Sequence, residues 1–151
     1  MTDGHDKKDR VTLHATAVAI AGAGLLIRGK SGSGKSDLAL RLIDRGADLI
    51  SDDQVVVSRQ GPELSLSPPP RLAGKLEVRS LGIWEREHVS GIALNLIIDL
   101  KDQVERFPMD RQVTILLGLE FPSCTLNAME PSAAIKAELA MQRTMQGAKE
   151  S

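Results

Sequence analysis

Short apolar runs, separated by glycine, proline and charged residues, divide the chain into predicted strands. Residues 11–16 alternate between apolar and polar side chains, which is the period of a half-buried strand. The apolar runs 18–20 and 25–27 flank a glycine-containing turn, which predicts a β-hairpin. The run 92–98 is the strongest candidate for a buried strand, and Asp99 closes it. Further strand-like segments are 49–57, which two acidic residues interrupt, 76–84 and 113–117.

Two segments show a helical period. Between Ser36 and Arg45 the apolar residues fall on one face, and Gly46 follows at a position where helices often end. Pro131 to Met145 predicts a C-terminal helix with a proline in its first turn. Its apolar stripe predicts packing against a sheet and consists of Ala134, Ala137, Met141 and Met145. Together these elements predict an α/β fold.

Length and composition fit one domain. With 151 residues and 42% hydrophobic content the chain can bury a core, whereas two full domains are not expected. We expect a flexible lead-in at residues 1–10, one domain at 11–146 and a flexible tail at 147–151.

Charge and cysteine content narrow the class of protein. The formal net charge is −1, which gives no electrostatic reason to expect a nucleic-acid or membrane partner. No apolar run approaches the roughly 20 residues that span a bilayer, and residues 1–10 lack the apolar core of a secretory signal. A lone cysteine, Cys124, excludes an internal disulfide. We therefore expect a cytoplasmic protein.

The segment between the predicted hairpin and the first helix has the pattern G-x-x-x-x-G-K-S of a phosphate-binding loop. Glycines let consecutive N–H groups point at one anion, and the N-terminus of the next helix adds partial positive charge. Lys35 supplies a fixed charge, and Ser36 offers a hydroxyl to Mg²⁺. The predicted phosphate-binding residues are Gly29, Lys30, Ser31, Gly32, Ser33, Gly34, Lys35 and Ser36. The chain is therefore predicted to bind a nucleotide or another polyphosphate.

An acidic pair follows the loop in sequence. Asp52 and Asp53 lie in the interrupted strand-like run, and buried adjacent carboxylates need a metal, a cation or a proton nearby. One interpretation is a base that takes a proton from an attacking hydroxyl, while its neighbour helps to hold metal or water. The other is a pair at a strand end with one side chain in water.

Three more charged residues are open to two interpretations. Glu77 and Arg79 would share one face of a strand, either as a metal ligand and a phosphate contact or as a surface ion pair worth about 0–1 kcal/mol. The apolar run before Asp99 resembles a Walker B strand, although many ordinary buried strands also end in aspartate. No N-K-x-D motif occurs, which disfavours a GTPase.

Several of these motifs occur in a recognisable order. They are Leu13-His14, the strand and loop at 22–36, the helix at 38–46, Asp52-Asp53, and Glu77-Val78-Arg79-Ser80-Leu81-Gly82-Ile83. From about Thr12 to the region of Arg111 the chain resembles the catalytic domain of bacterial HPr kinase/phosphorylase, which phosphorylates a serine of the phosphocarrier protein HPr. Ser80 stands where the family usually has glycine.

The resemblance implies a fold, cofactors and residue roles. The fold would be a P-loop kinase domain, like HPr kinase and PEP carboxykinase, with a central mixed sheet flanked by helices. ATP and Mg²⁺ would be the cofactors, HPr the partner and a homo-oligomer, a hexamer in the family, the assembly. The implied roles are phosphate binding by Lys35 and the loop amides, Mg²⁺ ligation by Ser36 and Glu77 with Asp53 as a further candidate, general base chemistry by Asp52, a position beside the transferring phosphate for His14, and a catalytic arginine at Arg111, with Arg106 as the weaker candidate.

Departures from the family leave alternatives open. The N-terminal domain of longer members has no counterpart here, and residues 112–135 contain no Arg or Lys where those members carry an arginine-containing loop tied to dephosphorylation. The kinase direction is therefore favoured over phosphorolysis of the phosphoserine. A non-catalytic ATP-binding regulatory module and a small-molecule P-loop kinase are the other two hypotheses.

Overall fold

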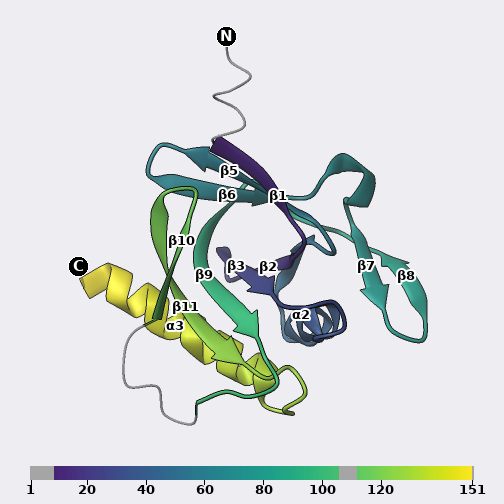
Figure 1. Cartoon of the computed structure of the whole chain (residues 1–151). Coiled ribbons are helices and arrows are strands. Elements are labelled where there is room, and N and C mark those ends of the chain that lie inside the picture. The colour runs from purple at the N-terminus through teal and green to yellow at the C-terminus, as the bar shows by residue number, and fades with distance from the viewer. Residues whose placement is uncertain (1–8, 106–111, 151) are drawn as a thin grey trace.

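The computed structural model describes residues 9–105 and 112–150, which form a branched sheet, a separate hairpin and two main helices (Figure 1). The elements are β1 Arg10–Leu13, β2 Thr16–Ile20, β3 Ala23–Arg28, α2 Lys35–Asp44, β4 Asp48–Ser51, β5 Val55–Gln60, β6 Glu63–Ser67, the 3₁₀ turn η1 Pro70–Leu72, β7 Lys75–Val78, β8 Gly82–Glu85, β9 Ile92–Leu100, β10 Gln112–Leu116, β11 Leu119–Leu126 and α3 Ala133–Glu150.

The main sheet is mixed, as predicted, and it branches at β9. The strand order is β1-β5-β6-β9-β3-β2-β4, with β11 also pairing with β9 and carrying β10 at its outer edge. β9 pairs in parallel with β3 and β11, and antiparallel with β6 at its beginning. β6 pairs with the beginning of β9 and β11 with its end, so the sheet curls. β1, β5 and β6 fold over one of its faces (Figure 1).

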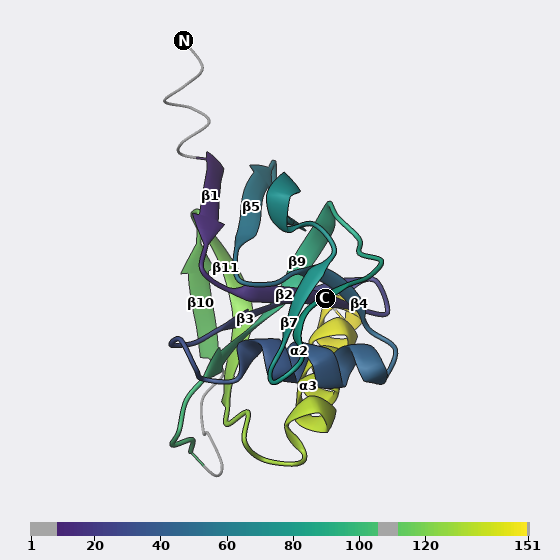
Figure 2. The same ribbon diagram turned by 90° about the vertical axis from the view of Figure 1, so that its right-hand side faces the viewer.

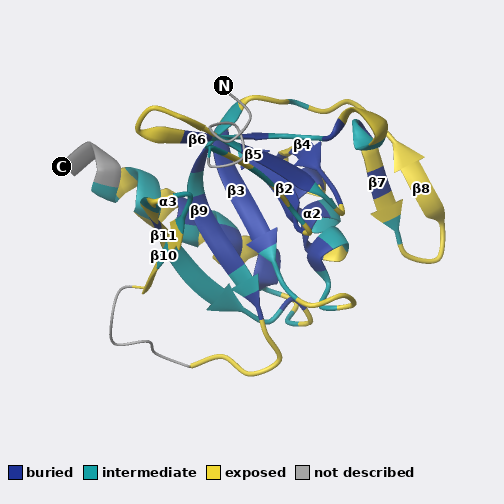
Figure 3. Cartoon of the chain, turned by 45° about the horizontal axis from the view of Figure 1, so that its top comes forward, coloured by how far each residue is buried: buried dark blue, intermediate teal, exposed yellow. Residues whose placement is uncertain are grey.

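The two faces of the sheet bury different partners. Leu25 and Ile27 of β3 face α2 and α3, whereas Leu26 faces the core enclosed by the curled strands. Both helices therefore cover the same face, and the stripe predicted for the C-terminal helix packs there through Ala134, Ala137 and Met141, each at most 3% exposed. Figure 3 shows the resulting band of buried residues through β2, β3 and β9.

Two glycine-containing turns determine the course of residues 20–46, one before β3 and one after α2. The two residues between β2 and β3, Ala21 and Gly22, both have positive φ, as a tight antiparallel hairpin requires. β3 then runs directly into the predicted phosphate loop and α2. The helix ends at Asp44, and Gly46, two residues later, has a φ of 112° and donates its N–H to the carbonyl of Ile43, as is typical of a glycine after a helix end.

Several sequence-based boundaries were wrong. The run 49–57 is two strands in different parts of the sheet, because Asp53 adopts φ 71° and turns the chain between β4 and β5. The segment 76–84 is a hairpin, so Arg79 lies in its turn and not on a strand face with Glu77. Asp99 lies inside β9, and the C-terminal helix extends from Ala133 to Glu150.

Two strands escaped the prediction. β6 contains serines at alternate positions, and β11 contains Pro122, which weakened its strand pattern. β11 pairs with β9 only from Ser123 onward, so the missing N–H of Pro122 removes no bond on that side.

Candidate functional site

The phosphate loop, Gly29–Ser36, connects β3 to α2 at the edge of the sheet (Figure 2). Gly32 and Gly34 have φ of 82° and 99°, a conformation that side chains rarely adopt. A Cβ on Gly34 would also lie 2.9 Å from Cβ of Ala128, and a Cβ on Gly29 would collide with the hydroxyl of Ser33. Backbone conformation therefore requires glycine at positions 32 and 34, and packing requires it at positions 29 and 34.

Lys35 closes the loop on itself. Its side-chain Nζ donates to the carbonyl of Gly29 at 2.8 Å and of Lys30 at 3.0 Å, and the residue is 8% exposed. The ammonium group therefore lies across the mouth of the loop, at the first turn of α2, where a phosphate would also meet the helix N-terminus. A bound phosphate would offer stronger acceptors than these two carbonyls.

Asp52 is the centre of a buried hydrogen-bond network. It is 3% exposed, and its carboxylate accepts from Ser36 Oγ at 2.8 and 3.0 Å, from Thr16 Oγ1 at 2.8 Å and from the backbone N–H of Glu77 at 2.9 Å. Three donors suit an ionised carboxylate, which only accepts. The network joins β2, the start of α2 and β7 to the turn after β4, so it brings the acid and the loop hydroxyl together.

Asp53 points away from its neighbour, toward solvent. Its Oδ1 lies 3.0 Å from Nε2 of His14, and the side chains of His14 and Asp53 are 60% and 56% exposed. The positive φ of Asp53 separates the two carboxylates, so the acidic pair divides into one buried and one exposed acid. His14 thus lies next to the acidic pair.

The residues at Asp52 can be tested for their fit to Mg²⁺. This ion prefers oxygen ligands and is commonly held by one or two carboxylates together with substrate phosphates. Ser36 and Asp52 offer such oxygens within one network, and Glu77 carries a carboxylate on the residue whose N–H reaches Asp52. Among the described residues no group of three or more His, Cys, Asp or Glu could hold a metal by itself. These oxygens therefore fit a Mg²⁺ ion whose remaining ligands are oxygens of the bound phosphates.

Three further residues were candidates for the site: Asp99, Arg106 and Arg111. Asp99 forms a two-bond ion pair with Arg28, at 2.8 and 3.1 Å, so the Walker B-like aspartate fixes the residue before the loop. Arg111 and Arg106 lie outside the described residues.

Sequence reasoning missed two residues of this region. Thr16 is 0% exposed and donates to Asp52, whereas the alternation of residues 11–16 had placed it on the polar face of a half-buried strand. Arg41 of α2 donates to the carbonyls of Ala128 and Glu130 and so fastens the segment after β11 to the helix that follows the loop.

The curled mixed sheet and the phosphate loop that leads into α2 define a P-loop kinase fold. None of the described helices is long and apolar enough to cross a membrane. Comparison with known proteins narrows the class further: the family model of the HPr Serine kinase C-terminal domain matches residues 7–146. The chain belongs to this family.

Curated and solved relatives agree with that assignment. HPr kinase/phosphorylases from Cupriavidus metallidurans and Burkholderia lata are each 36% identical over 149 residues, covering 90% of this chain and 46% of the relative. The chain thus spans about half the length of these relatives. The solved structure of the Hpr(Ser) kinase/phosphatase from Coxiella burnetii superposes with a TM-score of 0.78 at 27% identity, covering 93% of this chain and 99% of that one.

Proposed function

We propose that this chain is an ATP-dependent protein-serine kinase that phosphorylates HPr. The observation that carries the proposal is the bond between the buried carboxylate of Asp52 and the hydroxyl of Ser36 in the phosphate loop. Nucleotide binding alone needs only the loop. A carboxylate fixed beside the loop adds a group that can accept a proton where the γ-phosphate would lie. The names of the relatives supply the acceptor, HPr.

Different residues are assigned to phosphate binding, metal binding and charge stabilisation. Lys35 and the loop amides bind the β- and γ-phosphates, and Lys35 exchanges its two carbonyl acceptors for phosphate oxygens. Ser36 and Glu77 would hold Mg²⁺, with Asp53 as a further ligand candidate; the ion would offset charge on the phosphate oxygens. Arg111 is also proposed to offset negative charge, on the oxygens of the phosphoryl group that is transferred.

Asp52 is assigned the role of general base. As the acceptor serine oxygen bonds to the γ-phosphorus, the bond to the β–γ bridging oxygen breaks, and the serine proton moves to an Asp52 oxygen. The hydroxyls of Thr16 and Ser36 can rotate, so one of them can yield its place on Asp52 to the incoming serine. Burial limits the access of water, which would otherwise compete for the phosphoryl group.

The test is transfer of labelled γ-phosphate from ATP to HPr from the same organism. We expect serine-linked label with the wild-type chain, and its loss in Lys35→Ala and Asp52→Ala. Asp44→Ala, an exposed acid at the end of α2, is the control and should keep full transfer. Tight ATP binding without transfer would instead establish the regulatory module, and transfer to a small molecule the third hypothesis. Release of label from phosphoserine-HPr by inorganic phosphate measures phosphorolysis in the same samples.

The setting of the enzyme is also proposed. A kinase for HPr acts in the cytoplasm, without a nucleic-acid or membrane partner, and we assign it a homo-oligomeric, hexameric state. Light scattering coupled to gel filtration tests this assembly, and a monomer at assay concentration would contradict it.

A further inference from the structure

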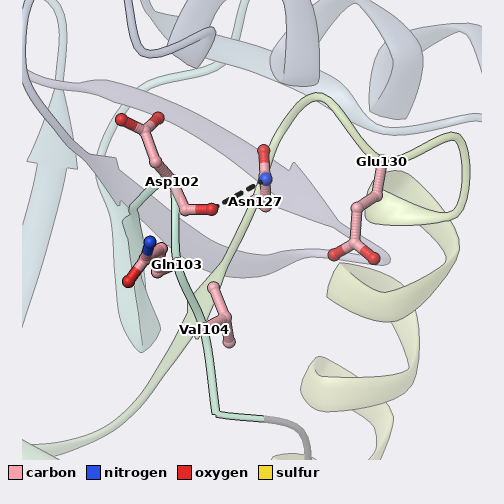
Figure 4. A pocket seen from close by; sticks show the side chains of 5 residues that line it. All are labelled: Asp102, Gln103, Val104, Asn127 and Glu130. Atoms are coloured by element: carbon pink, nitrogen blue, oxygen red, sulfur yellow. Dashed lines mark hydrogen bonds between the residues drawn. The ribbon is translucent and has the colours of Figure 1, made fainter.

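A cavity of about 370 Å³ lies beside the phosphate loop, and the function proposed above gives it no role. Two segments far apart in sequence line it, and Figure 4 shows them side by side. Asp102, Gln103 and Val104 follow β9, whereas Asn127 and Glu130 follow β11. The volume is at the lower end of the range for sites that enclose small organic ligands.

Strand topology explains why these segments meet at the loop. β3, β9 and β11 are parallel neighbours, so their carboxyl ends lie at one edge of the sheet. Leu100 and Leu126 are register partners, and the N–H of Lys101 donates to the carbonyl of Leu126 at 3.0 Å. β2 and β4 place Asp52 on the opposite side of β3. Ligands of such sheets bind outside the carboxyl ends of parallel strands, which are the ends that carry the loop and the cavity.

Direct contacts fix the cavity wall to the loop. The Cβ of Ala128 lies so close to Gly34 that a methyl group there would approach it to 2.9 Å. Arg41 donates to the carbonyl of Glu130 at 3.2 Å and also to that of Ala128, so α2 holds the segment after β11 that contributes Asn127 and Glu130 to the lining. A ligand with phosphates on the loop therefore has its other end within reach of the cavity.

The lining favours a neutral ligand rich in hydrogen-bond donors. Two of the five side chains are carboxylates, two are amides and one is valine. Asn127 is engaged within the wall, because its amide donates to the carbonyl of Asp102 at 3.1 Å and accepts from the N–H of Met129 at 2.9 Å. Glu130 bonds to Lys136 at 3.2 Å, whereas no described residue bonds to the carboxylate of Asp102. Carboxylates repel a second phosphate group and accept from hydroxyls.

We propose that this cavity binds the nucleoside half of the nucleotide, with Asp102 accepting hydrogen bonds from the ribose hydroxyls. The inference rests on the proposed function, since ATP is the phosphoryl donor there. None of the five described lining residues is aromatic, so none of them offers the base a ring to stack on. Recognition depends on the ribose and on the edges of the base, and purine nucleotides should be used with little discrimination.

Titration calorimetry with three ligands tests the cavity: Mg-ATP, Mg-2′,3′-dideoxy-ATP and inorganic tripolyphosphate. A hydrogen bond from a hydroxyl to a charged group corresponds to a loss of about tenfold or more when it is removed. In the wild-type chain, dideoxy-ATP should therefore bind about tenfold more weakly than ATP. Asp102→Ala should weaken ATP about tenfold, leave dideoxy-ATP within about twofold of its wild-type affinity, and leave tripolyphosphate unchanged or slightly tighter. Asp44→Ala removes the same charge elsewhere and should change none of the three.

The outcomes separate this inference from the function on which it rests. Equal binding of ATP and dideoxy-ATP by the wild-type chain overturns the ribose assignment even if phosphate transfer to HPr occurs. An equal loss of ATP and tripolyphosphate in Asp102→Ala also overturns it, because the aspartate would then act on the loop. Selective loss of ATP in a chain that fails to phosphorylate HPr supports the cavity and refutes the kinase. No binding of ATP or tripolyphosphate contradicts both.

Discussion

The two sides of the phosphate loop differ in how their acids are held. On the β2–β4 side, Asp52 is 3% exposed and three donors occupy its oxygens. On the β9–β11 side, Asp102 is exposed, and no described residue bonds to its carboxylate. The buried side has its polar groups arranged in advance, as charge stabilisation during a reaction requires. No described residue occupies the acceptors of the open side, so the two proposals assign the chemistry to the buried side and ligand binding to the open side.

The largest expected difference between buried and exposed acids comes from neutralising Asp52 and Asp53 one at a time. We expect Asp52→Asn to lower phosphate transfer by about 10²–10⁴-fold, the range for loss of a positioned base. Asp53→Asn, which removes a charge from the exposed neighbour, should cost less than about tenfold at saturating Mg²⁺. Steady-state transfer to HPr measures both. Equal losses would show that the exposed His14–Asp53 pair, and not the buried acid alone, takes part in the transfer.

A second substitution acts where the two sides meet. Gly34→Ala places a methyl group against Ala128 in addition to straining a backbone with φ 99°. Gly32→Ala strains a backbone with φ 82° but meets nothing within 4 Å. Left-handed strain costs about 1–2 kcal/mol, so Gly32→Ala should weaken ATP about tenfold. Gly34→Ala should weaken ATP binding about 100-fold, because the clash with Ala128 adds to the backbone strain.

Calorimetry with ATP and tripolyphosphate separates the two glycine effects. If Ala128 transmits the clash to the cavity, Gly34→Ala loses more affinity for ATP than for tripolyphosphate, whereas Gly32→Ala loses both equally. Identical behaviour of the two variants would show that the loop and the segment after β11 are independent.

Thr16 offers a smaller change on the buried side. Thr16→Val removes one donor from Asp52 while filling the same space, and a hydrogen bond to a charged group contributes about 1–3 kcal/mol. We expect kcat to fall about tenfold with little change in KM for ATP, together with a lower free energy of unfolding in urea. Thr16→Ser keeps the hydroxyl and should restore kcat. A Thr16→Ser variant as slow as Thr16→Val would mean that the methyl group, and not the donor, matters.

How far the sequence predicted this site depends on the range of the interactions. The hairpin before the loop, the loop itself and the end of α2 follow from glycines acting on their own turns, so local patterns were sufficient. β6 and β11 depend on pairing with β9, which no local pattern encodes, and Asp53 divides the run 49–57 through its own backbone. The partnership of Thr16 with Asp52 spans 36 residues. The cavity brings residues 102–104 beside 127–130 through the register of β9 and β11, which no local pattern encodes, so the sequence did not predict it.

Cys124 gives the smallest effect and tests the packing of the open side. It lies in β11 opposite Ile98 of β9, and burial raises the pKa of its thiol to about 11, with Asp99 adding to the rise and Arg143 opposing it. At pH 8 about one thiol in a thousand would then be ionised. Alkylation by iodoacetamide should therefore be about 10²-fold slower in the folded chain than in urea, since the thiolate is the nucleophile.

The same thiol links stability to pH in a definite direction. The unfolded thiol ionises near its ordinary pKa, about 8.5, whereas the folded thiol keeps its proton to about pH 11. The contribution to stability is therefore fully present below about pH 8.5 and is lost as the pH rises toward 11. Comparing urea unfolding of the wild-type chain and Cys124→Ala at pH 7.5 and 10 measures it, because the variant lacks this titration. If both proteins lose the same stability, the thiol is accessible to water and the end of β11 is as open as the cavity beside it.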